Sequence, residues 1–204
     1  MNTPQAFTSL RGWLRHLAAT DRLALIRPGV ALTHELAAIA KRLDGTQAAL
    51  FPQPGGHPMP VVSGFMSRRA WIAEAMGVPD AQLLQRFRAA AERPLPWREV
   101  ARDAAPAQQV VHPFGEGEGD IRTLLPIPTH SEHDNGPYIT AGLVIARNPK
   151  TGVQNVSINR IQIQGRDRLG VKPLYVLQDW QRLAFATEAK ALLSLPGVSA
   201  ELDR

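Results

Sequence analysis

The richest cluster of polar side chains lies in residues 126–142, PIPTHSEHDNGPYITAG. Four of its members are metal-ligand types: His130, Glu132, His133 and Asp134. Side chains so close along a loop diverge, so the pattern is more typical of a solvated loop with caps and turns. A functional site is the alternative, because the cluster directly precedes an expected strand, where loops commonly hold functional groups.

A second polar pattern runs through residues 155–165, NVSINRIQIQG. Its apolar positions change parity, because Val156 and Ile158 share one parity whereas Ile161 and Ile163 share the other. A strand with one buried face changes parity only by an extra residue, which predicts a β-bulge between Ile158 and Ile161. The bulge would put four polar side chains on one face: Asn155, Ser157, Arg160 and Gln162. Asparagine and arginine together suit an oxyanion, a phosphate or a metal-bridged phosphate, and an ordinary solvent-facing strand side is the equal alternative.

The elements that must position these residues can be expected from apolar spacing. Helical periodicity predicts helices over residues 8–20, 34–43, 68–76 and 81–93. The expected N-caps are Thr8 or Ser9, then Ser67 and Asp80 for the third and fourth helices. Short apolar runs predict strands over residues 23–27, 48–51 and 60–62. Strands alternating with helices predict an α/β layer, which we assign to a first domain of residues 1–95.

From about Pro94 the chain is richer in proline and then in strand patterns. Strands are expected over residues 109–112, 138–147 and 154–164, and the last two flank NPKTG, a compact turn that predicts a hairpin. We assign residues 96–170 to a second domain. The remaining residues, 171–204, form a tail with expected strands at 174–177 and 183–186 and a short helix at 188–195.

Composition excludes several classes of function. The chain has no cysteine, which excludes disulfides, thiolate metal sites and cysteine nucleophiles. A hydrophobic share of 44% suits a folded globular protein. The net charge of +5 comes mainly from scattered arginines without a basic stripe, so no nucleic-acid partner is expected. With no apolar run of about 18 residues and no signal-peptide pattern, we expect no membrane partner and a cytoplasmic location.

The stretch LPIPTHSEHDNGPYITAGLVIARNPKTGVQNVSINRIQIQGRDRLG closely resembles the UbiD decarboxylase family. Two earlier segments agree: TSLRGWLRHLAATDRLALI resembles the family's opening helix and strand, and MPVVSGFMSRRAWIAEAMG its next strand and helix. The resemblance covers about residues 7–170. It implies an N-terminal α/β layer followed by part of a split β-barrel of the FMN-binding type.

The resemblance also implies a chemistry. The family decarboxylates aromatic or unsaturated acids reversibly with prenylated FMN, whose phosphate is held through a divalent metal, usually Mn²⁺, with K⁺ alongside. Asn155 matches a metal ligand, and Ile158, Asn159 and Arg160 match the segment lining the cofactor. Arg160 also matches the arginine that binds the carboxylate of the small-molecule substrate. Loss of CO₂ leaves a carbanion, and the prenylated ring provides the electron sink that it needs.

After Gly170 the chain departs from the family pattern. The family continues with a histidine metal ligand and, later, a glutamate ligand and a proton-donating acid, whereas every histidine here lies at or before His133. Residues 165–204 resemble instead the end of the glutaminase domain of asparagine synthetases, whose cysteine nucleophile is absent. We therefore expect a truncated barrel whose unpaired strands would allow homo-oligomers.

Three hypotheses follow from these resemblances. The first is a carboxy-lyase subunit that uses prenylated FMN. The second is a non-catalytic truncated remnant or chimera that acts at most as a flavin-binding or protein-interaction module. The third is an amidotransferase-related interaction module built around the tail.

Overall fold

The computed structural model describes residues 6–93, 95, 98–112, 119–166, 168–171, 175–178 and 183–186. The chain is of the mixed α/β class, as expected, and its contacts divide it into two compact units, one ending at Glu132 and the other starting at His133. Each unit is described by itself. None of the helices in these ranges is both long and apolar enough to cross a membrane.

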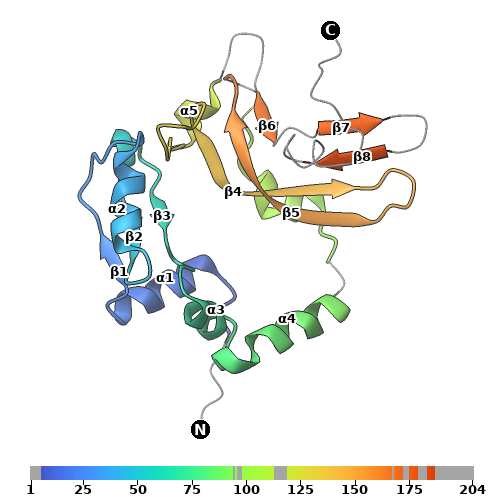
Figure 1. Ribbon diagram of the computed structural model, residues 1–204, viewed down its shortest axis with the longest axis horizontal. Helices are drawn as coiled ribbons and strands as arrows, with labels where there is room; N and C mark the ends of the chain where they lie inside the picture. The colour runs from blue at the N-terminus through green and yellow to red at the C-terminus, as the bar shows by residue number, and fades with distance from the viewer. Residues whose placement is uncertain are drawn as a thin grey trace. The chain divides into compact units, whose positions relative to one another are not determined.

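The first unit is built on a three-stranded sheet of order β1-β2-β3, shown in Figure 1. β1 (Leu23–Leu25) and β2 (Ala48–Phe51) are parallel, and β3 (Val61–Ser63) is antiparallel to β2. The parallel pair needs a crossover connection, and α2 (Glu35–Leu43) supplies it. The helices expected around this sheet are therefore confirmed in place. The other helices are α1 (Leu10–Ala19), α3 (Arg69–Ala75), α4 (Leu83–Glu92) and α5 (Ile121–Leu124), with 3₁₀ turns η1 (Pro54–Gly56), η2 (Asp80–Gln82), η3 (Arg102–Ala104) and η4 (Pro106–Gln108).

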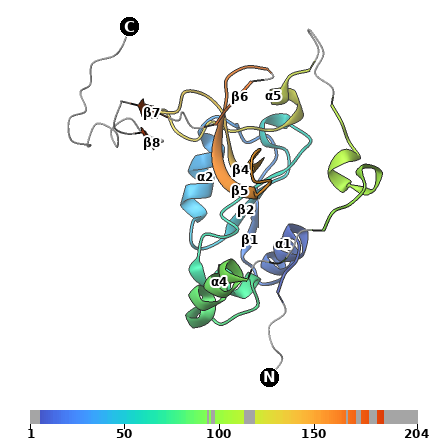
Figure 2. The ribbon, with the colours of Figure 1, turned by 90° about the vertical axis from the view of Figure 1, so that its right-hand side faces the viewer.

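β2 is buried on both of its faces. Ala48 packs into a cluster formed with α1 and α3, whereas Ala49 and Phe51, of opposite parity, pack into a cluster formed with α2. Figure 2 shows α1 beside β1 in this unit. The two clusters give the unit a core on each side of the sheet. Their buried members are Trp13, Leu17, Ala48, Trp71 and Ala75 in the first, and Val30, Leu36, Ala49 and Phe51 in the second.

The predicted helix caps are right in one case and wrong in two. Ser9 caps α1, since its Oγ accepts a hydrogen bond from the backbone N–H of Gly12. Ser67 does not cap α3; its Oγ accepts from the backbone of Gly45, and α3 begins one residue later. Asp80 lies in η2, before the fourth helix, and pairs with Arg69 at 2.8 Å. Both residues bind partners distant in sequence, which local patterns do not reveal.

The strand expected over residues 109–112 is absent. These residues follow η4 in an irregular segment, where Val110 and Val111 are 72% and 66% exposed. A two-valine run has the propensity of a strand, but no ladder partner pairs with it in the described part of the chain.

The second unit contains the predicted hairpin. β4 (Tyr138–Arg147) and β5 (Gln154–Ile163) are antiparallel, and β6 (Leu169–Val171) extends the sheet beside β5. Asn148 closes the turn, because its Oδ1 accepts hydrogen bonds from the backbone N–H groups of Lys150 and Thr151. β7 (Tyr175–Gln178) and β8 (Leu183–Ala186) form a separate two-stranded sheet. β8 has the bounds predicted for the second strand of the tail, and β7 begins one residue later than the first was predicted to begin. The helix expected over residues 188–195 lies outside the described residues.

The predicted bulge exists but lies on the opposite strand. Ile139 pairs with Ile161 and Gly142 with Asn159, so two residues of β4, Thr140 and Ala141, face the single residue Arg160. β5 itself is regular throughout. The parity change in its sequence reflects apolar residues on both of its faces, not an extra residue.

Candidate functional site

One face of the β4–β5 hairpin carries exposed apolar side chains. Leu143 lies opposite Ile158 and Ile145 opposite Val156, so the four share one face and form what we call the hairpin strip. Their exposed fractions are 65%, 78%, 64% and 54% respectively. An exposed apolar surface of this kind is typical of a face that binds a ligand or another protein segment.

Arg160 lies on the same face of β5, two residues beyond Ile158. Its Nη2 donates a hydrogen bond to Oδ2 of Asp134 at 2.5 Å, and its Cζ lies 4.0 Å from the centre of the Tyr138 ring. The Asp134 side chain is only 10% exposed, whereas that of Arg160 is 39% exposed. The hairpin strip thus ends at a fixed and partly accessible guanidinium.

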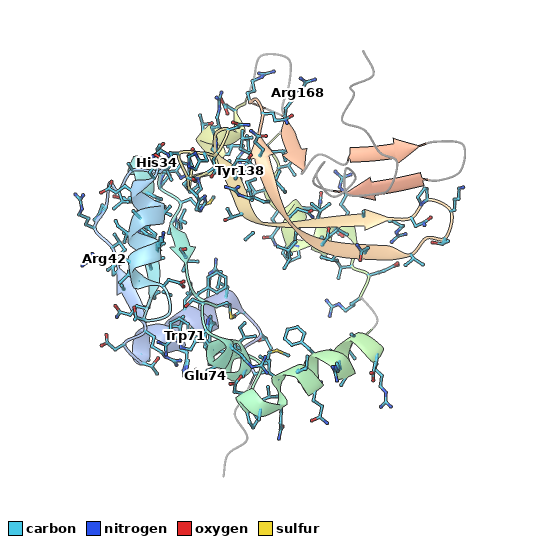
Figure 3. The ribbon with its side chains drawn as sticks, in the orientation of Figure 1. His34, Arg42, Trp71, Glu74, Tyr138 and Arg168 are labelled. Atoms are coloured by element: carbon cyan, nitrogen blue, oxygen red, sulfur yellow. The ribbon has the colours of Figure 1, made fainter. Side chains whose placement is uncertain are left out.

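The loop before β4 is fastened to the same end of the hairpin. Gln162 follows Arg160 on this face and its Nε2 donates to the backbone carbonyl of Asn135 at 2.7 Å. Ile163 donates its backbone N–H to the carbonyl of Pro137. Figure 3 marks Tyr138 at the start of β4, directly after this loop.

The other face of β5 carries the remaining predicted site residues. Ser157, Asn159 and Ile161 alternate with Arg160 along the strand, so they lie on this other face. Asn159 donates a hydrogen bond to Oγ of Ser157 at 2.7 Å, and Ile161 is buried. Asn155 is exposed and belongs to the same parity as Asn159. The expectation that Asn155 and Arg160 share a face is therefore wrong: β5 is unbroken, and five positions apart in a regular strand is an odd spacing.

A close approach between the strands shapes this second face. Gly142 is buried opposite Asn159, and a Cβ added to it would collide with Cδ1 of Ile161. The side chain of Ile161 thus fills the space that any larger residue at position 142 would need. Glycine is required here for space, beside the bulge.

The cluster of metal-ligand types does not assemble a metal site in the part of the chain that the structure describes. No group of three or more His, Asp or Glu side chains there could hold an ion. Asp134 binds Arg160 instead, within the second unit. In the first unit, His130 and Glu132 line an open hollow of about 340 Å³ together with His34 and Lys41.

A second charged cluster ties the first unit together. Glu74 on α3 accepts hydrogen bonds from Arg22 at 2.6 and 2.8 Å and lies 2.7 Å from Nε2 of His16. Arg22 also lies over the rings of Trp13 and Trp71, and Figure 3 shows Trp71 and Glu74 on α3. The Arg22 hydrogen bonds first, and then the His16 contact, lower the pKa of Glu74 to about 2 against the desolvation that would raise it. This cluster joins α1 and α3 to Arg22, the residue before β1, and contains none of the predicted site residues.

Two contacts of Arg160 escape the sequence patterns. Asp134 stands out only as a metal-ligand type, and Tyr138 only as the start of a strand, yet both contact Arg160. The pairing spans 26 positions of the chain, so no local periodicity signals it. The only local sign of these contacts is that an aspartate and a tyrosine lie four residues apart, on either side of Gly136–Pro137.

Family models match most of the chain. The N-terminal domain of 3-octaprenyl-4-hydroxybenzoate carboxy-lyase matches residues 14–91, and the Rift-related domain of the same enzyme matches residues 98–189. The second match continues past residue 170, into the tail. The likeness of residues 165–204 to asparagine synthetases does not appear in these matches and stays a prediction.

Curated relatives and solved structures agree with these matches. An uncharacterized protein in the cooM 5′ region of Rhodospirillum rubrum is 37% identical over 169 residues, which cover 82% of this chain and 36% of the relative. Anhydromevalonate phosphate decarboxylase of Methanothermobacter thermautotrophicus is 37% identical over 114 residues, covering 56% of this chain and 25% of the relative. An evolved dimeric form of the UbiD-class enzyme HmfF from Pelotomaculum thermopropionicum, solved in complex with prFMN, has a TM-score of 0.74 at 43% identity and covers 80% of this chain and 38% of its own. The chain thus spans about a third of the length of the first of these relatives.

Proposed function

We propose that this chain, which belongs to the UbiD family of carboxy-lyases, contributes the carboxylate-binding part of a decarboxylase for aromatic or unsaturated acids. The observation that carries the proposal is the position of Arg160 at the end of the hairpin strip. A guanidinium beside an apolar surface suits a ligand with a carboxylate at one end and an apolar body behind it. Sequence resemblance assigns the same role to Arg160.

The chain's own residues have separate tasks in this proposal. Arg160 binds and orients the carboxylate, which brings the reacting carbon to a defined place. Leu143 and Ile158, together with the flavin that they would carry, exclude water from the apolar body of the ligand. Attraction of the carboxylate alone does not accelerate the loss of CO₂, because it stabilises the bound acid and the transition state alike.

The hairpin strip fits a flavin, and the described residues do not fit its metal. An aromatic ring system needs an apolar surface of the kind that Leu143, Ile145, Val156 and Ile158 expose, and prenylated FMN bound there would supply the electron sink for decarboxylation. A divalent ion needs about six oxygen-rich ligands, whereas Asn155 offers one amide on the opposite face of β5. We keep Asn155 as a proposed ligand only in company with residues outside the described ranges, and no step depends on Mn²⁺ or K⁺.

Flavin binding tests the cofactor part of the proposal. The chain is co-expressed with a prenyl-FMN-forming enzyme, and flavin absorbance is measured on the purified protein. Ile158→Asp should lose the absorbance, since it puts a charge at the centre of the hairpin strip. Val153→Asp is the matched control, because Val153 is 65% exposed on the same hairpin but lies outside the strip. Equal flavin content in both variants would contradict the proposal.

Activity tests the second candidate, a non-catalytic remnant or chimera. The resemblance puts the proton-donating acid later in the family sequence than residue 170, and we expect no CO₂ release from cinnamic or hydroxybenzoic acids by this chain with prenylated FMN and Mn²⁺. Turnover that is lost in Arg160→Ala would refute this expectation, and would mean that residues 171–204 or a second copy supplies the acid. We also propose that residues 171–204 derive in part from an asparagine synthetase-like segment, although the Rift-related match through residue 189 limits how much of the tail that can be.

A further inference from the structure

The guanidinium of Arg160 is held from two sides by residues that we call the Arg160 clamp, Asp134 and Tyr138. The carboxylate of Asp134 accepts a hydrogen bond from Nη2 at 2.5 Å. The ring of Tyr138 lies 4.0 Å from Cζ, a distance typical of a cation–π contact. A hydrogen bond and a ring contact together restrict the movement of the guanidinium.

The ion pair between Asp134 and Arg160 is unfavourable to separate. Its side chain is 10% exposed, so separation from Arg160 would leave a carboxylate that is largely shielded from water and has lost a cationic partner. Such a loss is strongly unfavourable for a shielded ion pair. A ligand carboxylate therefore adds to the Asp134–Arg160 pair and does not displace Asp134.

Arg160 keeps enough hydrogen-bonding capacity for that ligand. A guanidinium has five N–H groups, and the recorded bond to Asp134 uses one, on Nη2. The side chain of Arg160 is 39% exposed, so part of it is open to solvent. The second N–H of Nη2, together with the neighbouring N–H of Nε or of Nη1, remains to bind a planar carboxylate in the two-bond arrangement that arginine favours.

The backbone around the clamp is itself constrained. Asp134 and Tyr138 flank Gly136–Pro137, and this loop is tied to β5 by the hydrogen bond between Gln162 and the Asn135 carbonyl. The bulge of β4 lies directly opposite Arg160. The register of the hairpin thus brings Tyr138 under the guanidinium.

We propose that Asp134 and Tyr138 are positioning residues that fix the guanidinium of Arg160 so that its remaining N–H groups receive the ligand carboxylate. The inference rests on the proposed function, because it concerns the same arginine. Asp134 also offsets the charge of Arg160, so recognition depends on the directed hydrogen bonds of a held group. Neither residue touches the reacting carbon.

The test compares variants that differ only in the holding contact. Asp134→Ala and Asp134→Asn both remove the negative charge, but asparagine keeps an oxygen acceptor for Nη2. Tyr138→Leu and Tyr138→Phe both remove the hydroxyl, but phenylalanine keeps the ring. Binding of trans-cinnamate to the full chain is measured by NMR titration, together with solvent exchange of the Arg160 Nε–Hε proton, identified by its loss in Arg160→Ala.

We expect cinnamate to bind about threefold to tenfold more weakly to Asp134→Ala than to Asp134→Asn, and to Tyr138→Leu than to Tyr138→Phe, which is the cost of ordering one long side chain at binding. Exchange of the Arg160 Nε–Hε proton should be faster in the alanine and leucine variants. A general loss of structure would not be restored by asparagine or phenylalanine in this way. Arg147→Ala is the matched control for charge, since Arg147 lies at the other end of β4 and contacts Gln154.

The outcomes separate the two proposals. If Arg160→Ala loses cinnamate binding but the paired variants bind equally and exchange equally, the positioning role is refuted and the proposed function stands. If Arg160→Ala binds cinnamate as well as the unmodified chain does, the carboxylate does not lie at Arg160, and both proposals fail.

Discussion

Replacement of Glu74 by glutamine should destabilise the first unit and change how its stability depends on pH. Glu74 joins Arg22 and His16 and has a pKa of about 2 in the folded chain, against an ordinary value of 4.5. This difference corresponds to about 3 kcal/mol in favour of the charged form. The side chain of Glu74 is 36% exposed, so solvent screening reduces the contribution to about 1–2 kcal/mol.

The sign follows from the lowered pKa. A carboxyl group whose pKa is lower in the folded state contributes its full stabilisation above the unfolded-state value and loses it as the pH falls through the folded-state value. The contribution of Glu74 is therefore complete above about pH 5 and disappears between about pH 4.5 and pH 2. Glu74→Gln should lose it at every pH, so the stability difference between the two proteins shrinks as acid is added.

Urea unfolding followed by tryptophan fluorescence measures the effect, because Trp13 and Trp71 both lie near Arg22. We expect the free energy of unfolding of Glu74→Gln to be about 1–2 kcal/mol lower than that of the unmodified chain at pH 7. Glu92→Gln is the matched control, since Glu92 is exposed at the end of α4. An equal loss in both variants, or a loss for Glu74→Gln that persists unchanged at pH 2, would refute the reasoning.

Three further predictions concern the core, the hairpin and the metal. Leu17→Ala removes a side chain that is 0% exposed, and should cost about 2–5 kcal/mol of unfolding free energy in the same urea assay, unlike a change at exposed Leu10. Gly142→Ala should destabilise the hairpin by about 1–3 kcal/mol, because the new Cβ meets Ile161; faster amide hydrogen exchange in β4 and β5 would report it, and Gly165→Ala, where a Cβ makes only ordinary contacts, should not show it. Calorimetry with Mn²⁺ and FMN should give dissociation constants no tighter than roughly the high micromolar range, and tight binding that survives Asn155→Ala would show that the metal site is misplaced.

Elements with a strong local pattern could be predicted from the sequence. The apolar spacing in α1 and the turn NPKTG between β4 and β5 both act over a few residues, and the structure confirms the helix and the hairpin. The run at residues 109–112 has the same local propensity but no partner strand in the described ranges, which is why propensity alone failed there.

The arrangement around Arg160 depends on pairing, which a single strand's sequence does not reveal. A change of parity within β5 is compatible with a bulge in β5 or with apolar residues on both of its faces. The structure shows apolar residues on both faces of β5, and the bulge lies on β4 at Thr140 and Ala141. The contact between Asp134 and Arg160 joins a loop to a strand 26 positions away, so Arg160 could be identified by resemblance but its partners could not.

The bulge on β4 also makes chain length a determinant of chemistry. Side chains alternate along a strand, so a simple ladder that continued from the Gly142–Asn159 pair without the bulge would put Tyr138 opposite Ile163, on the side that Asn159 occupies. The aromatic ring would leave the guanidinium, although no residue that touches Arg160 had been replaced. A homologous chain that is one residue shorter between Tyr138 and Gly142 would reach the same Tyr138–Gln162 pair without a bulge. In a chain of the present length, the bulge is what keeps Tyr138 on the face of Arg160.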